Sequence, residues 1–220
     1  MQNVAILLIG FSVFYALVLL LSHFREDDYQ GKRVIHFMGV LLLLSLSGLQ
    51  LAHFYYLQYH SPIIFSRWYL LLLFLVAPCF YFYTRPLLKA QFRLKPLQWL
   101  HFLPLVSVFM LPYKYVFTLA FMLGSIYLLW LLSAIYALRK HRDKFKAEII
   151  LLSFVFVVAI VVSVLALTMP FSEELFYALY ASAIGLALLI VALILGHTPK
   201  ISEHVSEVAR ETYAVSTLTA

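Results

Sequence analysis

The chain has 220 residues, of which 64% are hydrophobic and 12% are charged, and its formal net charge is +6. A soluble domain is nearer half apolar, with about a quarter of its residues charged. The composition therefore excludes a soluble globular protein and indicates that lipid is the solvent, while the single cysteine, Cys79, excludes an internal disulfide.

Seven apolar stretches follow one another along the chain, each near the length of about 20 residues that crosses the hydrocarbon core of a bilayer. We expect the spans at residues 4–22, 34–56, 63–83, 96–112, 115–138, 148–169 and 174–196. The fourth is the shortest. Pro104 inside it, like Pro78 in the third, removes a backbone hydrogen bond and predicts a kink. The expected fold is an all-α membrane protein, a seven-transmembrane-helix bundle over residues 1–197.

Positive charge is concentrated on one side of the expected membrane. The links after the first, third and fifth spans, together with the tail, hold 14 of the 16 lysines and arginines, and the other side holds only Arg67 and Lys114. Because cytoplasmic links carry the excess of basic residues, we expect the N-terminus outside and the C-terminus in the cytoplasm. Basic residues beside spans also favour the lipid bilayer as partner, and no nucleic acid contact is expected.

Aromatic residues crowd the expected membrane interfaces, as is typical of belts at headgroup depth. The outer belt comprises Tyr55, Tyr56, Tyr59, Trp68 and Tyr69, and the inner belt comprises Tyr81, Tyr83 and Trp99.

Small residues share one face of the seventh span: Ala178, Ala181, Ser182 and Gly185. Small side chains let helix backbones approach closely in lipid. We interpret this face as a packing seam inside the bundle, with the contact face of a homodimer as the alternative. After the span, residues 198–220 are expected to form a cytoplasmic linker with an amphipathic helix at 199–213.

Polar residues gather near the outer ends of several spans. Gln50 and His53 are three residues apart and share a helix face, and Arg67 is expected about one turn inside the third span. An arginine within a span either reaches for the headgroups or marks a functional site. We expect a site for a small or amphiphilic ligand, anionic if it binds the arginine. The candidate residues are Gln50, His53, Arg67, Tyr113, Tyr177 and Tyr180.

A second polar group is expected near the inner ends. His36, Gln98 and His101 predict a contact between the second and fourth spans, for which interhelical hydrogen bonds are the simplest role. His36 and His53 are 17 residues apart, about 25 Å along a helix, which disfavours a haem held by the two. No acid lies deep in an expected span, and no close grouping of His, Cys and acid suggests zinc. We therefore expect no cofactor, no metal and no enzymatic activity.

The end of the chain resembles a known family. The seventh span is followed by a Gly196/Pro199 break, a short acidic helix and the sequence ARETYAVSTLTA. This arrangement resembles the N-terminal seven-transmembrane sensor domain of membrane-bound AraC/XylS-type bacterial transcriptional regulators. The matching positions are Tyr213, Ser216, Thr217 and Leu218. The resemblance implies a bacterial inner membrane and control of transcription, although residues 1–220 contain no helix-turn-helix.

These features favour a receptor-like sensor that passes an outer-leaflet or periplasmic signal through the seventh span to a cytoplasmic output. A small transporter or channel-like carrier is the alternative. Such a carrier needs a polar path, for which the spans offer Ser45, Ser47, Ser125 and Ser163 but no acid. A scaffold protein without a ligand stays open as a third interpretation.

Overall fold

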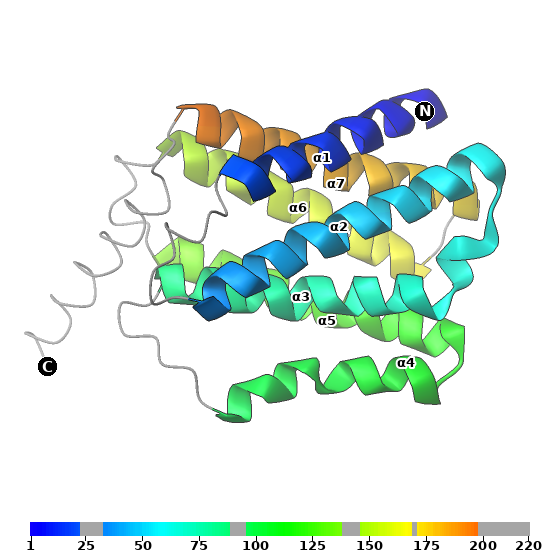
Figure 1. Cartoon of the computed structure of the whole chain (residues 1–220), viewed down its shortest axis with the longest axis horizontal. Helices are drawn as coiled ribbons and strands as arrows, with labels where there is room; N and C mark the ends of the chain where they lie inside the picture. The colour runs from blue at the N-terminus through cyan, green and yellow to red at the C-terminus, as the bar shows by residue number, and fades with distance from the viewer. Residues whose placement is uncertain (23–32, 89–95, 138–145, 169–170, 198–220) are drawn as a thin grey trace, which may run out of the picture.

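The computed structural model describes residues 1–22, 33–88, 96–137, 146–168 and 171–197, and the expected linker at 198–220 lies outside them. All regular structure in the described ranges is helical, as predicted (Figure 1). In chain order the elements are α1 (Gln2–Ser22), α2 (Arg33–Tyr59), the 3-10 helix η2 (Pro62–Phe65), α3 (Arg67–Leu88), the 3-10 helix η3 (Pro96–Val106), α4 (Ser107–Met110), α5 (Tyr113–Ala137), α6 (Lys146–Thr168) and α7 (Glu173–His197).

Five of the described helices are long and apolar enough to cross a membrane: α1, α2, α7, Arg67–Arg85 of α3 and Tyr113–Ala134 of α5. Two further apolar stretches, Pro96–Met110 and Ser153–Thr168, are shorter over the residues whose side chains are described. Large apolar side chains such as Leu7 and Met110 are exposed on the outside of the bundle, where lipid would cover them. The described part of the chain is thus compatible with a multi-pass membrane protein.

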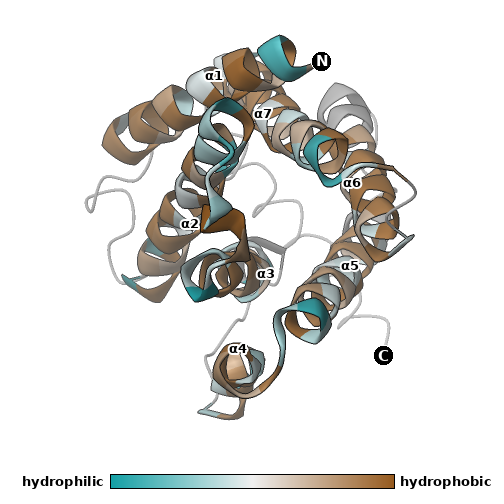
Figure 2. Cartoon of the chain, turned by 90° about the vertical axis from the view of Figure 1, so that its right-hand side faces the viewer, coloured by the Kyte–Doolittle hydropathy of each residue, from teal (hydrophilic) through white to brown (hydrophobic). Residues whose placement is uncertain are grey.

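The long helices form a ring when viewed along their axes (Figure 2). Each of α2, α3, α5, α6 and α7 packs on the next, and α7 returns to contact α2. α1 packs against both α2 and α7, while η3 and α4 pack on α3 at the periphery. This order brings α1, α2, α3 and α7 together around the candidate site.

The small residues of α7 pack against α1. A Cβ atom at Gly185 would lie 2.7 Å from Leu8 Cβ and 2.9 Å from the Leu8 carbonyl oxygen, so the two backbones touch there. Ala178 and Ala181 are buried in the same contact with Ala5 of α1. Within the chain, α1 therefore packs on this face, as expected of a packing seam.

The turn between α2 and α3 places Arg67 differently from the expectation. His60 follows the last residue of α2 and has a positive φ of 50°. Its N–H donates to the Tyr56 carbonyl at 2.9 Å, as in a left-handed helix cap. Ser66 then starts α3, because its hydroxyl oxygen accepts the Tyr69 N–H at 3.2 Å. The predicted start at residue 63 was wrong: Arg67 is the first residue of α3 rather than a turn inside it.

The expected fourth span is not one α-helix. Eleven residues, Pro96–Val106, form η3, and only Ser107–Met110 are α-helical. Pro104 has no N–H and cannot donate an α-helical hydrogen bond. A 3-10 helix rises about 2.0 Å per residue, so the eleven residues of η3 extend about 22 Å. Pro104 therefore lies within a 3-10 helix and not at a kink of an α-helix.

Candidate functional site

Gln50 and His53 lie side by side on α2 and are completely buried. The helix periodicity predicted their shared face, and the structure shows that their side chains are bonded, with His53 Nδ1 3.2 Å from Gln50 Oε1. On its other side, His53 Nε2 lies 3.0 Å from the hydroxyl of Tyr69 on α3. Gln50 Nε2 lies 2.8 Å from Ser12 Oγ on α1 and 3.1 Å from the carbonyl oxygen of Ala181 on α7. We call Ser12, Gln50, His53, Tyr69 and the Ala181 carbonyl the His53 network.

The hydrogen-bonding groups fix the direction of the bonds that Gln50 makes in the His53 network. The Ala181 carbonyl can only accept, so the NH2 group of Gln50 faces it and Oε1 faces His53. His53 therefore donates from Nδ1, and in a neutral imidazole its Nε2 accepts from the Tyr69 hydroxyl. Ser12 accepts from Gln50 and donates to the Ile9 carbonyl at 2.8 Å. With a neutral imidazole, the result is one directed chain across four helices.

Tyr113 and Tyr177 form a second directed chain beside the first. The Tyr113 hydroxyl donates to the carbonyl oxygen of Ile64 in η2 at 3.1 Å. Because that bond uses its only proton, the Tyr177 hydroxyl is the donor in the 3.2 Å bond between the two tyrosines. α5, α7 and the turn before α3 are thereby linked at the same end of the bundle.

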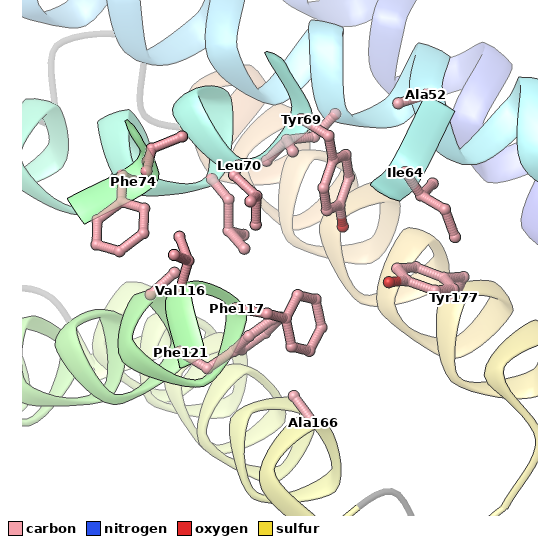
Figure 3. Close-up of a cluster of buried hydrophobic side chains, with 14 of the residues drawn as sticks. Ala52, Ile64, Tyr69, Leu70, Phe74, Val116, Phe117, Phe121, Ala166 and Tyr177 are labelled. Carbon is pink, nitrogen blue, oxygen red and sulfur yellow. The ribbon is translucent and has the colours of Figure 1, made fainter. Parts of the chain in front are cut away.

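Rings from α7 join the two chains. The Tyr180 ring centre lies 5.0 Å from that of His53, and the Tyr177 ring centre lies 5.7 Å from it. Both distances are in the range of favourable aromatic contacts. In Figure 3 the Tyr69 and Tyr177 side chains enter the same apolar interior, beside Phe117 of α5. Five of the six candidate residues, all but Arg67, therefore meet in one cluster.

Arg67 is exposed at the first residue of α3. Its neighbour Trp68 is also exposed, whereas Tyr69 is 1% exposed. Consecutive helix residues point about 100° apart, so the turn that sets the start of α3 sends Tyr69 inward and Arg67 outward. The expected anionic ligand depended on Arg67, and without that residue the buried cluster gives no reason for a negative charge on the ligand.

His101 is the member of the expected inner polar contact whose partners the structure describes. A ring nitrogen, His101 Nδ1, is hydrogen-bonded to the Tyr127 hydroxyl of α5, and the His101 ring centre lies 4.6 Å from that of Tyr81 on α3. The described contacts of His101 run to α3 and α5, since η3 packs on α3. His36 and Gln98 are both partly buried, on α2 and η3.

Three members of the His53 network are not predicted from the sequence: Ser12, Tyr69 and the Ala181 carbonyl. Tyr69 was assigned to the outer aromatic belt, and Tyr81 to the inner one, but both are buried and contribute to the interior. Trp68, Tyr59 and Trp99 are exposed, as the belt prediction requires. Ser12 could have been predicted as a candidate from the sequence, since its hydroxyl lies in the middle of an apolar helix. The role of the Ala181 carbonyl could not be predicted, because every residue has a backbone carbonyl and the sequence does not distinguish one from another.

No group of three or more His, Cys, Asp or Glu side chains suited to a metal ion occurs among the described residues. Comparisons of the chain with protein-family models, with curated proteins and with solved structures find no match.

Proposed function

We propose that the chain is a membrane-embedded, receptor-like sensor in which the His53 network and the Tyr113–Tyr177 pair receive the signal and α7 transmits it. One observation carries the proposal. α7 supplies Tyr177, Tyr180 and the Ala181 carbonyl to the buried cluster at one end, and its other end, His197, leads into residues 198–220. A rearrangement of the cluster would therefore act directly on α7.

The proposed topology has seven spans, with the cluster at the outer end. The helix ends that border residues 23–32, 89–95 and 138–145 lie together at one end of the bundle (Figure 1), and these links carry most of the basic residues. The turns at residues 60–66 and 111–112 lie at the opposite end with Met1. The positive-inside rule then places the basic end in the cytoplasm. A bacterial inner membrane and a transcriptional output follow from the family resemblance alone.

The proposed ligand is small, amphiphilic and uncharged. The side chains that are bonded within the cluster are an amide, an imidazole and hydroxyls, and aromatic rings enclose them. A ligand that competes for these bonds would favour one arrangement of the directed chains over another. Only a ligand with different affinity for two states can shift their populations. An uncharged hydrogen-bonding ligand matches these groups without bringing an unpaired charge into the interior.

The first test of the proposal measures the distal end of α7. Spin labels at Leu21→Cys and Gly196→Cys, in a Cys79→Ala background, report the distance between the ends of α1 and α7. Both positions are exposed, and nothing lies within 4 Å of a Cβ at Gly196. We expect Tyr177→Phe, which removes the donor to Tyr113, to shift or broaden this distance by about 2 Å, the size of helix displacements in known switches.

The matched control for that test is Tyr115→Phe, which removes a hydroxyl from an exposed tyrosine of α5. It should leave the distance unchanged. If Tyr177→Phe gives the same distance distribution as the unmodified protein, the cluster does not act on α7 and the proposed transmission is wrong.

Membrane orientation has its own prediction. A cysteine at exposed Lys114 should react with a membrane-impermeant maleimide added to intact cells, whereas one at exposed Arg33 should react only after lysis. The native Cys79 is completely buried and gives a low background. Labelling of both sites from the same side would contradict the seven-span topology.

A further inference from the structure

The Tyr180 side chain extends from α7 into the interior of the ring of helices. Its ring centre lies 5.0 Å from that of His53 on α2 and 5.3 Å from that of Phe121 on α5. α2 and α5 are not neighbours in the ring, because α3 packs between them (Figure 2). A side chain of α7 that contacts both of these helices lies inside the ring and not on its lipid-facing outside.

The Tyr180 hydroxyl has no hydrogen-bond partner among the described residues. The neighbouring hydroxyls of Tyr69 and Tyr177 are both hydrogen-bonded, and each of these two residues is 1% exposed. Tyr180 is only partly buried, and its oxygen is not among the fully enclosed polar atoms without a partner. A small molecule inside the ring can therefore reach this hydroxyl without breaking an existing bond.

Three apolar side chains of other ring helices are also partly buried: Leu46 of α2, Val76 of α3 and Leu123 of α5. Tyr180 and Leu46 pack against the same buried cluster, and Tyr180, Val76 and Leu123 pack against another. Leu46, Val76 and Leu123 share a third cluster. All four residues lie about 10–20 Å along their helices from the end at which the 60–66 turn lies. They therefore border one interior region with apolar walls.

We propose that this interior region binds an uncharged, lipid-soluble carbonyl compound, such as an aryl ketone, whose oxygen accepts the Tyr180 O–H. A phenolic O–H without a partner is a donor, and a carbonyl needs only a donor to be satisfied. An alcohol would bring a further O–H that needs an acceptor, and an unpaired buried polar group is costly. A charged ligand would be more costly still, because the walls are apolar.

The position of Tyr180 connects this ligand to the proposed sensor. The Tyr180 ring contacts His53, so a carbonyl held by Tyr180 lies beside the bonds for which the ligand is proposed to compete. The inference rests on the proposed function only for the effect of the ligand on α7. Binding itself depends on Tyr180 and on the apolar walls.

The test is photolabelling of the full chain in lipid nanodiscs with an acetophenone that carries a trifluoromethyl diazirine. Peptide mass spectrometry locates the labelled residues. The comparison probe has an ethyl group in place of the acetyl group, so it has a similar size but no carbonyl. We expect the ketone to label residues of the interior region, such as Leu46 and Leu123. Tyr180→Phe should lower this labelling about fivefold, the scale of one hydrogen bond, and should leave labelling by the ethyl probe unchanged.

Tyr180→Phe breaks no described hydrogen bond, so this variant should fold like the unmodified protein. Its matched control is Tyr115→Phe, which removes a hydroxyl from an exposed tyrosine and should not change the labelling. Ketone labelling that is equal in the Tyr180→Phe variant and the unmodified protein would overturn the site. Labelling confined to exposed residues such as Leu193 would also overturn it.

A second variant tests the interior region without removing the hydroxyl. Leu123→Phe enlarges a side chain that borders the region, and it should lower interior labelling by both probes. Leu119→Phe is the same substitution at an exposed position of α5 and should leave interior labelling unchanged. Equal labelling in the two phenylalanine variants would show that the probes do not enter the ring.

The distance between spin labels at the ends of α1 and α7 separates this inference from the proposed function. If interior labelling depends on Tyr180 but acetophenone leaves that distance unchanged, the binding site stands and the transmission through α7 is wrong. If acetophenone changes the distance equally in the Tyr180→Phe variant, the transmission stands and the site at Tyr180 is wrong.

Discussion

Gln50→Leu is expected to lower the free energy of unfolding by about 2–4 kcal/mol, the largest effect of a single side chain in the His53 network. Leucine fills a similar volume but accepts no hydrogen bond from His53 and donates none to Ser12 or Ala181. The His53 Nδ1–H is then left without its partner in a completely buried site. A buried donor without a partner costs about 1–3 kcal/mol.

The control for this variant is Gln58→Leu, the same substitution on the same helix at an exposed position. It should change stability by less than about 0.5 kcal/mol, as surface substitutions do. Unfolding is measured by titration with sodium dodecyl sulfate in mixed micelles, followed by tryptophan fluorescence. Equal stability of the two variants would mean that the buried bonds of Gln50 contribute nothing, and the His53 network could not act as a structural hub.

The second large effect is expected at Gly185. Gly185→Ala should destabilise the bundle by about 1–3 kcal/mol, the range of overpacked cores. The added methyl group would lie 2.7 Å from Leu8 Cβ and 2.9 Å from the Leu8 carbonyl oxygen. Part of this contact is backbone, so α1 and α7 have to separate. In Gly185→Leu the larger side chain should have a greater effect and should release α1 from α7, which crosslinking between the two helices would detect.

Gly124→Ala on α5 is the matched control, because nothing lies within 4 Å of a Cβ added there. Alanine favours a helix over glycine by about 1 kcal/mol, so this variant should be slightly stabilised. The same titration measures both glycine variants. A Gly185→Ala protein as stable as Gly124→Ala would show that the close approach of α1 and α7 does not exist in the membrane protein.

The local pattern of apolar residues in the sequence predicted much of the helical fold. A span must offer an apolar side chain at nearly every position because lipid surrounds it, and such runs are visible without knowledge of the neighbouring helices. The helical content and five long apolar helices follow from them. The shared face of Gln50 and His53 followed equally from helical periodicity. The sequence pattern failed at two places: in η3, which contains Pro104, and at the turn before α3, where Ser66 caps the helix.

The sequence by itself determined that the described residues are helical and that Gln50 and His53 share one helix face, since both properties depend on residues close in the chain. Only the tertiary structure decided which helices meet. In lipid no difference in hydrophobicity selects between apolar faces, so close packing and hydrogen bonds make the choice. That choice sets Gly185 against Leu8, turns Tyr69 inward to His53 and leaves Arg67 outside. The Ala181 carbonyl that links the network to α7 exists as a partner only once those helices are packed.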